Sequence, residues 1–294
     1  MNQLESLRAF VTAVDAGSLS AAARELAMPL PTLSRKVADL ERHLGTALLV
    51  RTSRRLAITE AGQAYVATAR RLLEELAEAD RAARGEYQEP RGELAIAAPL
   101  VFGRLHVLPI VAELLRDYPD IRVRLVLSDR VANLVEDHLD VAVRIGELGE
   151  SSLIALRVGS VRRVVCASPA YLEAQRRPKR PADLSRHACI AFESTFATTI
   201  EWRFAEETVA IRPRLTVTTA EAAIDAAIAG LGIARVLSYQ LREPERDHRL
   251  VRVLASFEPA AIPVQLVRAG PLVPRKVRAF LALAATRLKP ILDR

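Results

Sequence analysis

Hydroxyl and guanidinium side chains gather on one side of a predicted helix over residues 31–44. Apolar residues at i, i+4, i+7 and i+11 give this helix a continuous buried face: Leu33, Val37, Leu40 and Leu44. At about 100° per residue, Arg35 and Arg42 point to the opposite face, and Thr32 and Ser34 lie on its flanks. A helix that is buried on one side and carries such groups on the other can enter a DNA major groove.

A basic segment follows this helix. Two short apolar strands, expected at 47–50 and 56–58, flank a turn-prone tip that contains Arg51, Thr52, Arg54 and Arg55. These groups are expected to hold the DNA backbone or to enter the minor groove, and Ser20 completes the predicted DNA-contacting set. Residues 1–89 hold twelve basic and twelve acidic residues, but residues 35–55 carry a net charge of +4. The alternative interpretation is a helical domain with a solvated basic face.

A second group of candidate binding residues follows the predicted strands of the region after residue 90. Open α/β sheets bind ligands beyond the carboxyl ends of their strands, and free amides at a helix N-terminus favour an anion. The predicted ligand-contacting residues are Pro99, Leu100, Val101, Phe102, Arg144, Gly146, Thr218 and Thr219. Arg144 can bind a carboxylate, and its alternative role is a salt-bridged scaffold residue.

The elements that position the first group form a compact N-terminal unit. A helix ending at Gly17 and a second helix over 21–27 precede the helix at 31–44 and its basic hairpin, which together predict a winged helix-turn-helix. A long helix over 60–83 follows, with Thr59 as its expected cap. Its apolar residues are spaced 4, 3, 4, 3, 4, the pattern of a coiled-coil seam: Tyr65, Ala69, Leu72, Leu76, Ala79 and Ala83. This seam predicts a partner chain, although the helix can instead pack on its own domain. Residues 85–92 are expected to be a linker.

The region after Glu93 alternates between strands and helices. Strands at 94–97, 121–127 and 141–145 and helices at 105–116 and 131–138 predict a parallel sheet covered on both faces. A second set of expected strands covers 163–167, 190–192, 201–204, 209–211, 215–218 and 233–235. Its expected helices cover 169–175, 220–229 and 238–241. A strand at 264–267 and a helix at 275–288 close the chain.

The N-terminal motifs resemble those of LysR-type transcriptional regulators. They are the Ala-rich helix 20–27, Ser34-Arg35, the L-E-x-x-L-G run 40–45, the R-T-x-R-R segment 51–55 and the T-E-A-G run 59–62. The sequence departs from the common S-Q-P turn, because Pro29-Leu30-Pro31 replaces it and the glutamine often available for a base contact is absent.

The C-terminal motifs are similar to those of the effector domain of the same family. They are A-A-P-x-x-F-G at 97–103, S-D-R at 128–130, D-V-A-V-R-I-G at 140–146, A-S-P-A-Y-L at 167–172 and A-G-L-G-I-A at 229–234. Many members have a Ser or Thr near Ala98 that holds the acid group of the ligand, and this chain lacks it. In this fold Thr218 and Thr219 would face the ligand from the opposite subdomain.

The resemblance implies a multidomain α and α/β fold. It places a winged helix-turn-helix at 1–59, a linker and dimerisation helix at 60–89, and a two-subdomain effector domain of the periplasmic-binding-protein type 2 fold at 90–294. Subdomain I would comprise 92–162 and 267–294, and subdomain II 163–266. The implied partners are double-stranded operator or promoter DNA, a small-molecule effector, and further copies of the chain in a homodimer or homotetramer.

Composition and motifs argue against a membrane protein, a secreted protein and an enzyme. The chain has 294 residues, and no uncharged run reaches the roughly 20 residues of a membrane helix. The N-terminus lacks a basic signal region, so a cytoplasmic protein without a membrane partner is expected. Cys166 and Cys189 cannot form a disulfide framework. Scattered histidines and the absence of a nucleophile elbow or P-loop predict no enzyme activity, no metal and no cofactor. A second hypothesis is a small-molecule-binding protein of the same fold without a regulatory role, and residues 1–89 argue against it.

Overall fold

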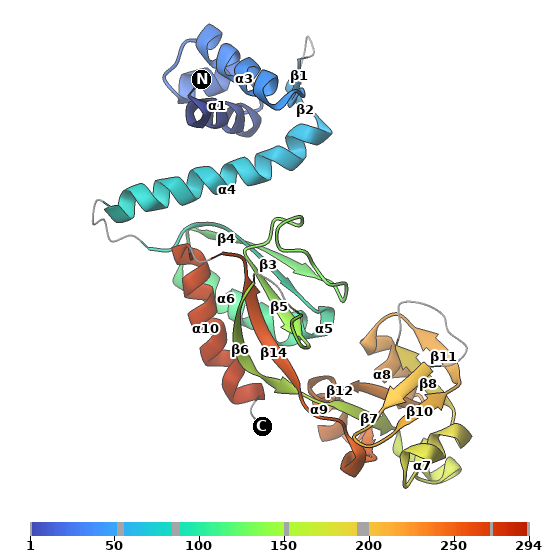
Figure 1. Cartoon of the computed structure of the whole chain (residues 1–294). Coiled ribbons are helices and arrows are strands. Elements are labelled where there is room, and N and C mark those ends of the chain that lie inside the picture. The colour runs from blue at the N-terminus through green and yellow to red at the C-terminus, as the bar shows by residue number, and fades with distance from the viewer. Residues whose placement is uncertain are drawn as a thin grey trace. The chain divides into compact units, whose positions relative to one another are not determined.

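The computed structural model describes residues 2–51, 56–83, 89–149, 153–192, 200–270 and 273–292. The chain divides into two compact units, Met1–Gly92 and Glu93–Arg294 (Figure 1). In the described part of the chain, no helix is both long and apolar enough to cross a membrane.

The first unit is a winged helix-turn-helix, as predicted. Its elements are α1 (Gln3–Asp15), α2 (Leu19–Glu25), α3 (Leu30–Leu44), β1 (Leu49–Arg51), β2 (Leu56–Ile58) and α4 (Glu60–Ala83). Phe10, Leu33 and Leu40 are fully buried in its core. Helix α2 begins two residues earlier than expected, because the Ser18 hydroxyl accepts a hydrogen bond from the Ala21 amide at 3.0 Å.

Helix α4 has the predicted bounds, and its first and second halves differ in burial. The Thr59 hydroxyl caps it by accepting from the Gly62 amide at 2.9 Å. Val66 and Ala69 are buried in the core of the first unit. Leu72 and Leu76, one turn apart, are 48% and 36% exposed. The first half of the helix therefore belongs to the core of the first unit, and the second half presents apolar side chains to solvent.

The second unit begins with a five-stranded sheet in the order β4-β3-β5-β14-β6. Its strands are β3 (Gly92–Ala98), β4 (Ile121–Leu127), β5 (Val141–Ile145), β6 (Ile154–Val161) and β14 (Ile262–Arg268). Strands β3 and β5 are parallel, but β14 runs antiparallel to β5 and β6. The expected parallel sheet is therefore mixed, because β14 returns from the second subdomain. Strand β6 was not predicted, and β14 joins this sheet at Ile262, earlier than the expected crossing near 266.

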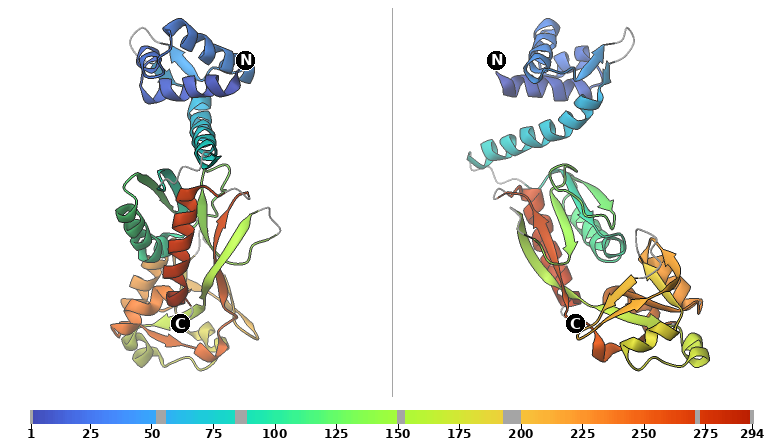
Figure 2. Two further views of the ribbon diagram at one scale, coloured as in Figure 1. Left: turned by 90° about the vertical axis from the view of Figure 1, so that its left-hand side faces the viewer. Right: turned by 45° about the vertical axis from the view of Figure 1, so that its right-hand side comes forward.

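Helices and turns cover the two faces of this sheet differently. On one face lie α6 (Leu108–Asp117) and α10 (Arg275–Leu292), whose buried residues share a core with β3 and β5; Figure 2 shows α10 in red along the sheet. A short helix α5 (Leu100–Phe102) and a π-helical turn (Gly103–Val107) lead into α6. The other face packs on Leu134 and Leu139 from the segment before β5.

The predicted helix over 131–138 is absent, and the segment forms turns instead. The Asn133 side chain accepts from the amides of Val135 and Glu136, and the Asp137 carboxylate accepts from the Asn133 amide at 2.8 Å. These side chains compete with helical hydrogen bonds for the same backbone groups. The prediction was wrong because it followed the spacing of the apolar residues and overlooked this competition.

The second subdomain contains a five-stranded sheet in the order β11-β8-β12-β7-β13. Its strands are β7 (Arg163–Ala167), β8 (Cys189–Phe192), β11 (Pro213–Val217), β12 (Ile233–Leu237) and β13 (Val251–Val253), and the hairpin β9 (Ile200–Arg203) with β10 (Thr208–Ile211) lies beside it. Its helices are α7 (Pro169–Gln175), α8 (Ala220–Ile228) and α9 (Ser238–Arg246). Strand β13 was not predicted. This subdomain completes the expected two-subdomain α/β fold.

Candidate nucleic-acid interface and effector pocket

Helix α3 separates an apolar face from a polar one, as its sequence predicts. Leu33 and Val37 are buried, whereas Arg35 and Arg42 are exposed. Thr32 and Ser34 are half-buried at the flanks, and Ser20 is exposed in the first turn of α2. Helix α3 ends at Gly45, whose φ of 69° is in the left-handed region.

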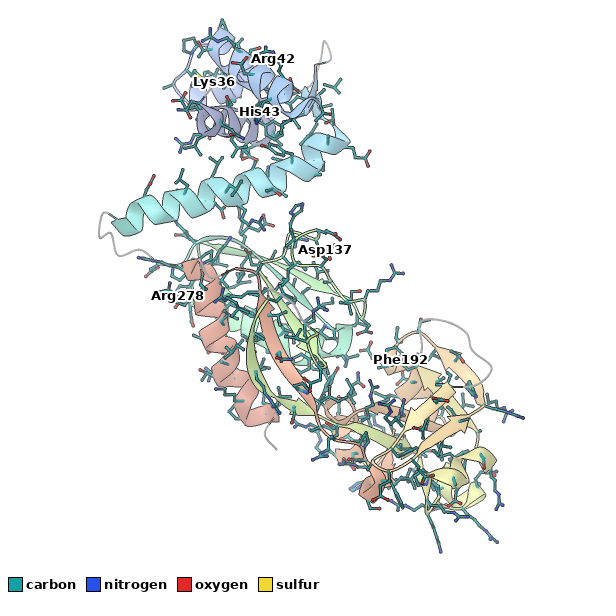
Figure 3. The ribbon with its side chains drawn as sticks, viewed as in Figure 1. Lys36, Arg42, His43, Asp137, Phe192 and Arg278 are labelled. Atoms are coloured by element: carbon teal, nitrogen blue, oxygen red, sulfur yellow. The ribbon has the colours of Figure 1, made fainter. Side chains whose placement is uncertain are left out.

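Two of the three cations of α3 are paired within the protein. The Arg42 Nη1 atom lies 2.6 Å from Asp39 Oδ1, and Lys36 forms an ion pair with Glu5 of α1. Figure 3 shows Lys36, Arg42 and His43 along the helix. Among the described residues, Arg35 makes no ion pair. Arg35 is therefore the cation of α3 that can meet DNA without first breaking an internal contact.

The wing begins directly after α3, and Glu41 fixes it to the helix. The Glu41 carboxylate accepts from the amides of Leu48 and Leu49, at 2.8 and 3.0 Å. Glu41 is part of the L-E-x-x-L-G run, and these two hydrogen bonds give it a positioning role. Thr52, Arg54 and Arg55 lie outside the described residues, as does the side chain of Arg51, whose backbone pairs with Leu56.

A cavity of about 110 Å³ lies at the carboxyl ends of β3, β4 and β5. Its walls are mainly apolar and come from Ala97, Ala98, Pro99, Val126, Val131, Ala132, Ala142, Val143 and Ile145; its polar residues are Ser128, Asp129, Arg130 and Arg144. Pro99 and Arg144 are the sequence-predicted ligand contacts that line it. The backbone amide of Leu100 donates to Asp129 Oδ1 at 3.1 Å. This amide was expected to bind an anionic ligand, and it already binds a carboxylate of the protein.

One buried nitrogen of the Arg144 side chain has no hydrogen-bond partner. Its Nη2 donates to the Ala132 carbonyl, but its Nε is buried without a hydrogen-bond partner. Within the described ranges Arg144 forms no ion pair, so nothing there supports the alternative role of a salt-bridged scaffold residue. A half-buried guanidinium without an ion-pair partner, beside a mainly apolar cavity, favours a ligand with an acceptor or anionic group.

The remaining predicted ligand contacts do not line this cavity. Val101 and Phe102 are buried in the core. Gly146 donates its amide to the Pro263 carbonyl at 3.0 Å, and Thr219 caps α8 by accepting from the Ala222 amide at 3.2 Å. Thr218 is exposed. Their side chains and amides thus have structural partners or face solvent.

Contacts between the two subdomains join Phe102 and Arg104 of the first subdomain to residues of the second. The Phe102 ring lies edge-on to His106 and Tyr239, with centroid distances of 4.9 and 5.2 Å. Arg104 pairs with Glu221 of α8 at 2.8 Å. Burial lowers the pKa of His106 to about 4, and its Nε2 has no hydrogen-bond partner. The His106 ring also lies edge-on to Tyr239, with centroids 5.6 Å apart. More than a hundred residues separate Tyr239 from these two rings and Glu221 from Arg104, so no local pattern indicates the contacts.

Comparisons with known proteins match both units. Residues 4–63 match the model of the bacterial regulatory helix-turn-helix protein, lysR family, and residues 87–289 match the LysR substrate binding domain. A relative from Xanthomonas campestris described as an HTH-type transcriptional regulator is 33% identical, over 95% of this chain and 83% of its own length.

Two solved structures resemble the whole chain. CrgA of Neisseria meningitidis, a LysR-type transcriptional regulator, has a TM-score of 0.62 and 32% identity, and covers 97% of this chain and 98% of its own. The virulence activator AphB of Vibrio cholerae has a TM-score of 0.62 and 28% identity, and covers 97% of this chain and 99% of its own.

Proposed function

The chain belongs to the LysR family of effector-responsive, DNA-binding transcriptional regulators, and we propose that α3 reads its operator while the cavity beside Arg144 holds its effector. The assignment of these roles to particular residues rests on the geometry of each site. Arg35 carries the first assignment, and the unpartnered Nε of Arg144 carries the second.

The outward face of α3 supplies the groups that a major groove can accept. Arg35 is exposed and can donate to a guanine edge or to a phosphate, and Thr32 and Ser34 lie beside it. Lys36 and Arg42 already have carboxylate partners, so they suit phosphate contacts better than base reading. The segment 51–55 would follow the flanking backbone, and Glu41 holds its base against α3.

The effector is a small molecule with an apolar body and an acceptor or anionic group. The apolar walls of the cavity suit the body, and Arg144 suits the polar group. Asp129 already accepts from the Leu100 amide, which moves the expected anion contact from that amide to Arg144. Binding alters transcription only to the extent that the ligand prefers one arrangement of the two subdomains.

Two copies of the chain are proposed to join through α4. Leu72 and Leu76 lie on one side of the helix and are exposed in the single chain, although most apolar side chains of the first unit are covered. Pairing through this seam would present two α3 helices to the two halves of a pseudo-palindromic operator. A regulator of bacterial promoters works in the cytoplasm, where its DNA lies.

Selection of genomic fragments by the full chain tests this proposal. We expect the purified protein to enrich fragments with an inverted repeat whose half-sites lie a whole number of helical turns apart. Enrichment of fragments without a shared repeat would contradict the proposed reading by paired α3 helices. The genes beside the enriched fragments would indicate the chemical class of the effector.

A further inference from the structure

Leu30, the first residue of α3, is an exposed apolar side chain on the proposed reading helix. It is 43% exposed and does not belong to the core cluster of the first unit, whose described members include its neighbours Met28 and Leu33. Leu72 and Leu76 have similar exposure, but their helical spacing explains them as a seam. Leu30 has no such explanation within the unit.

Helix α3 begins with an apolar residue, and it lacks the polar cap of the two helices that flank it in the first unit. Pro29 precedes Leu30, Pro31 follows it, and no side chain caps the helix. The neighbouring helices α2 and α4 begin with hydroxyl caps from Ser18 and Thr59. Pro31 suits the first turn of a helix, but Leu30 satisfies none of its free amides, as a Ser, Thr, Asp or Asn cap would.

The partner of this side chain follows from the chemistry of the major groove. The N-terminal residues of a reading helix contact base edges, and the apolar group that those edges present is the C5-methyl group of thymine. Exposed Arg35, five residues further along α3, supplies a charge that attracts this helix to DNA. We propose that Leu30 packs against the methyl group of one thymine in each operator half-site. This inference rests on the proposed role of α3.

Replacing thymine by uracil tests the contact, because it removes the methyl group alone. An operator is first selected from random duplexes with the full chain, and each thymine is then replaced by uracil, one position at a time, in both half-sites. At the contacted position we expect the affinity of the wild-type protein to fall about fourfold for each half-site, the equivalent of one buried methyl group. The pair 5-methylcytosine and cytosine at that position should show the same difference.

Substitutions at Leu30 separate its contribution from other contacts. Leu30→Ala should bind the thymine and uracil operators equally, and Leu30→Met should keep part of the discrimination. Leu4→Ala is the matched control, because Leu4 of α1 is also exposed, at 39%. This control should keep the wild-type affinity and discrimination.

The outcomes distinguish this inference from the proposed function. A wild-type protein that selects no duplex contradicts the role of α3 itself. A wild-type protein that binds its operator but tolerates uracil at every position overturns the Leu30 contact, even if a Leu30 variant fails to fold. Full discrimination by a folded Leu30→Ala variant overturns it as well.

Discussion

Two arginines carry the proposed chemistry, and they differ in what surrounds them. Arg35 is exposed on a helix whose other cations have carboxylate partners. Arg144 is half-buried beside apolar walls and has one orphaned nitrogen. An exposed cation costs the folded protein little, whereas a buried donor without a partner carries a desolvation penalty. The role of Arg35 is therefore tested by DNA affinity, and that of Arg144 by the free energy of unfolding.

Replacing Arg35 should weaken operator binding and relax its specificity. The loss of a bidentate contact to a base costs about 1–3 kcal/mol, roughly fivefold to 150-fold in affinity. Fluorescence anisotropy of Arg35→Ala on the selected operator and on single-base variants measures both effects. Arg42→Ala is the matched control and should lose less affinity, without a change of preference, because Asp39 already pairs with Arg42. Unchanged affinity and preference in Arg35→Ala would refute the assignment.

Replacing Arg144 by methionine should leave the free energy of unfolding unchanged or raise it. The substitution removes an orphaned Nε and the desolvation of its charge, which offsets the loss of the hydrogen bond to the Ala132 carbonyl, and it keeps an apolar side chain of similar length. Urea unfolding followed by circular dichroism measures the change. A loss of more than about 2 kcal/mol would identify Arg144 as a scaffold residue and remove the argument for an anionic effector.

The thiols should be inert in the folded protein. Burial raises the pKa of Cys166 and of Cys189 to about 12, and both side chains are fully buried. We expect a disulfide reagent at pH 8 to modify neither thiol until the protein unfolds. Stoichiometric modification of the native chain would show that one of these strands opens readily.

At the scale of elements, local hydrogen bonds position the sites. Glu41 joins α3 to β1, Thr59 begins α4, and the antiparallel pair of β1 and β2 forms the base of the wing. The backbone of Gly62 lies so close to the Leu48 carbonyl that a Cβ atom there would overlap it. The T-E-A-G run is thus a packing requirement where α4 leaves the wing.

Removing the Glu41 carboxylate should loosen the wing. Glu41→Ala leaves the amides of Leu48 and Leu49 without their acceptor, at an expected cost of about 1–3 kcal/mol. Glu41→Gln retains one acceptor oxygen and should lose less. Hydrogen exchange of the two amides reports the change directly, and unchanged protection in Glu41→Ala would mean that another group holds the wing.

The contact between the subdomains should depend on pH through His106. Its pKa in the folded chain is about 4, below the ordinary value of 6.5, because burial opposes the charged form. The unfolded chain therefore takes up a proton first as the pH falls, so stability is lost from pH 6.5 down to about 4. In His106→Gln this contribution is absent, and the difference in unfolding midpoint between the two proteins should shrink on acidification from pH 7 to 5. A constant difference would contradict the burial of His106.

Elements that are defined by local signals could be predicted from the sequence. The prediction missed strands whose formation depends on pairing with segments far along the chain. The bounds of α4, β4, β5 and α7 agree with those expected, because periodicity and caps define each of them within a few residues. The antiparallel entry of β14 and the missed strands β6 and β13 depend on pairing with segments far along the chain. The same holds at the proposed effector cavity, where Asp129, after β4, accepts from the Leu100 amide after the neighbouring strand β3.

At the scale of the whole molecule, the account requires two chains. The exposed pair Leu72 and Leu76 should lie in an interface, and a lysine there would be costly. We expect the double variant Leu72→Lys and Leu76→Lys to be monomeric by light scattering and to bind the operator at least tenfold more weakly. Ala64→Lys, on the exposed side of the same helix, should remain oligomeric. If the double variant remained fully oligomeric, Leu72 and Leu76 would not lie in the interface between the chains.

Site-directed DNA cleavage is the decisive test of whether α3 lies in the major groove of both half-sites. His43→Cys places a thiol on the exposed end of α3, and the buried native thiols allow a cleaving iron chelate to be attached there alone. We predict two clusters of cleavage on the selected operator, one in each half-site and a whole number of helical turns apart. Cleavage no stronger than that from a chelate at Leu4→Cys, with the operator still bound, would contradict the account.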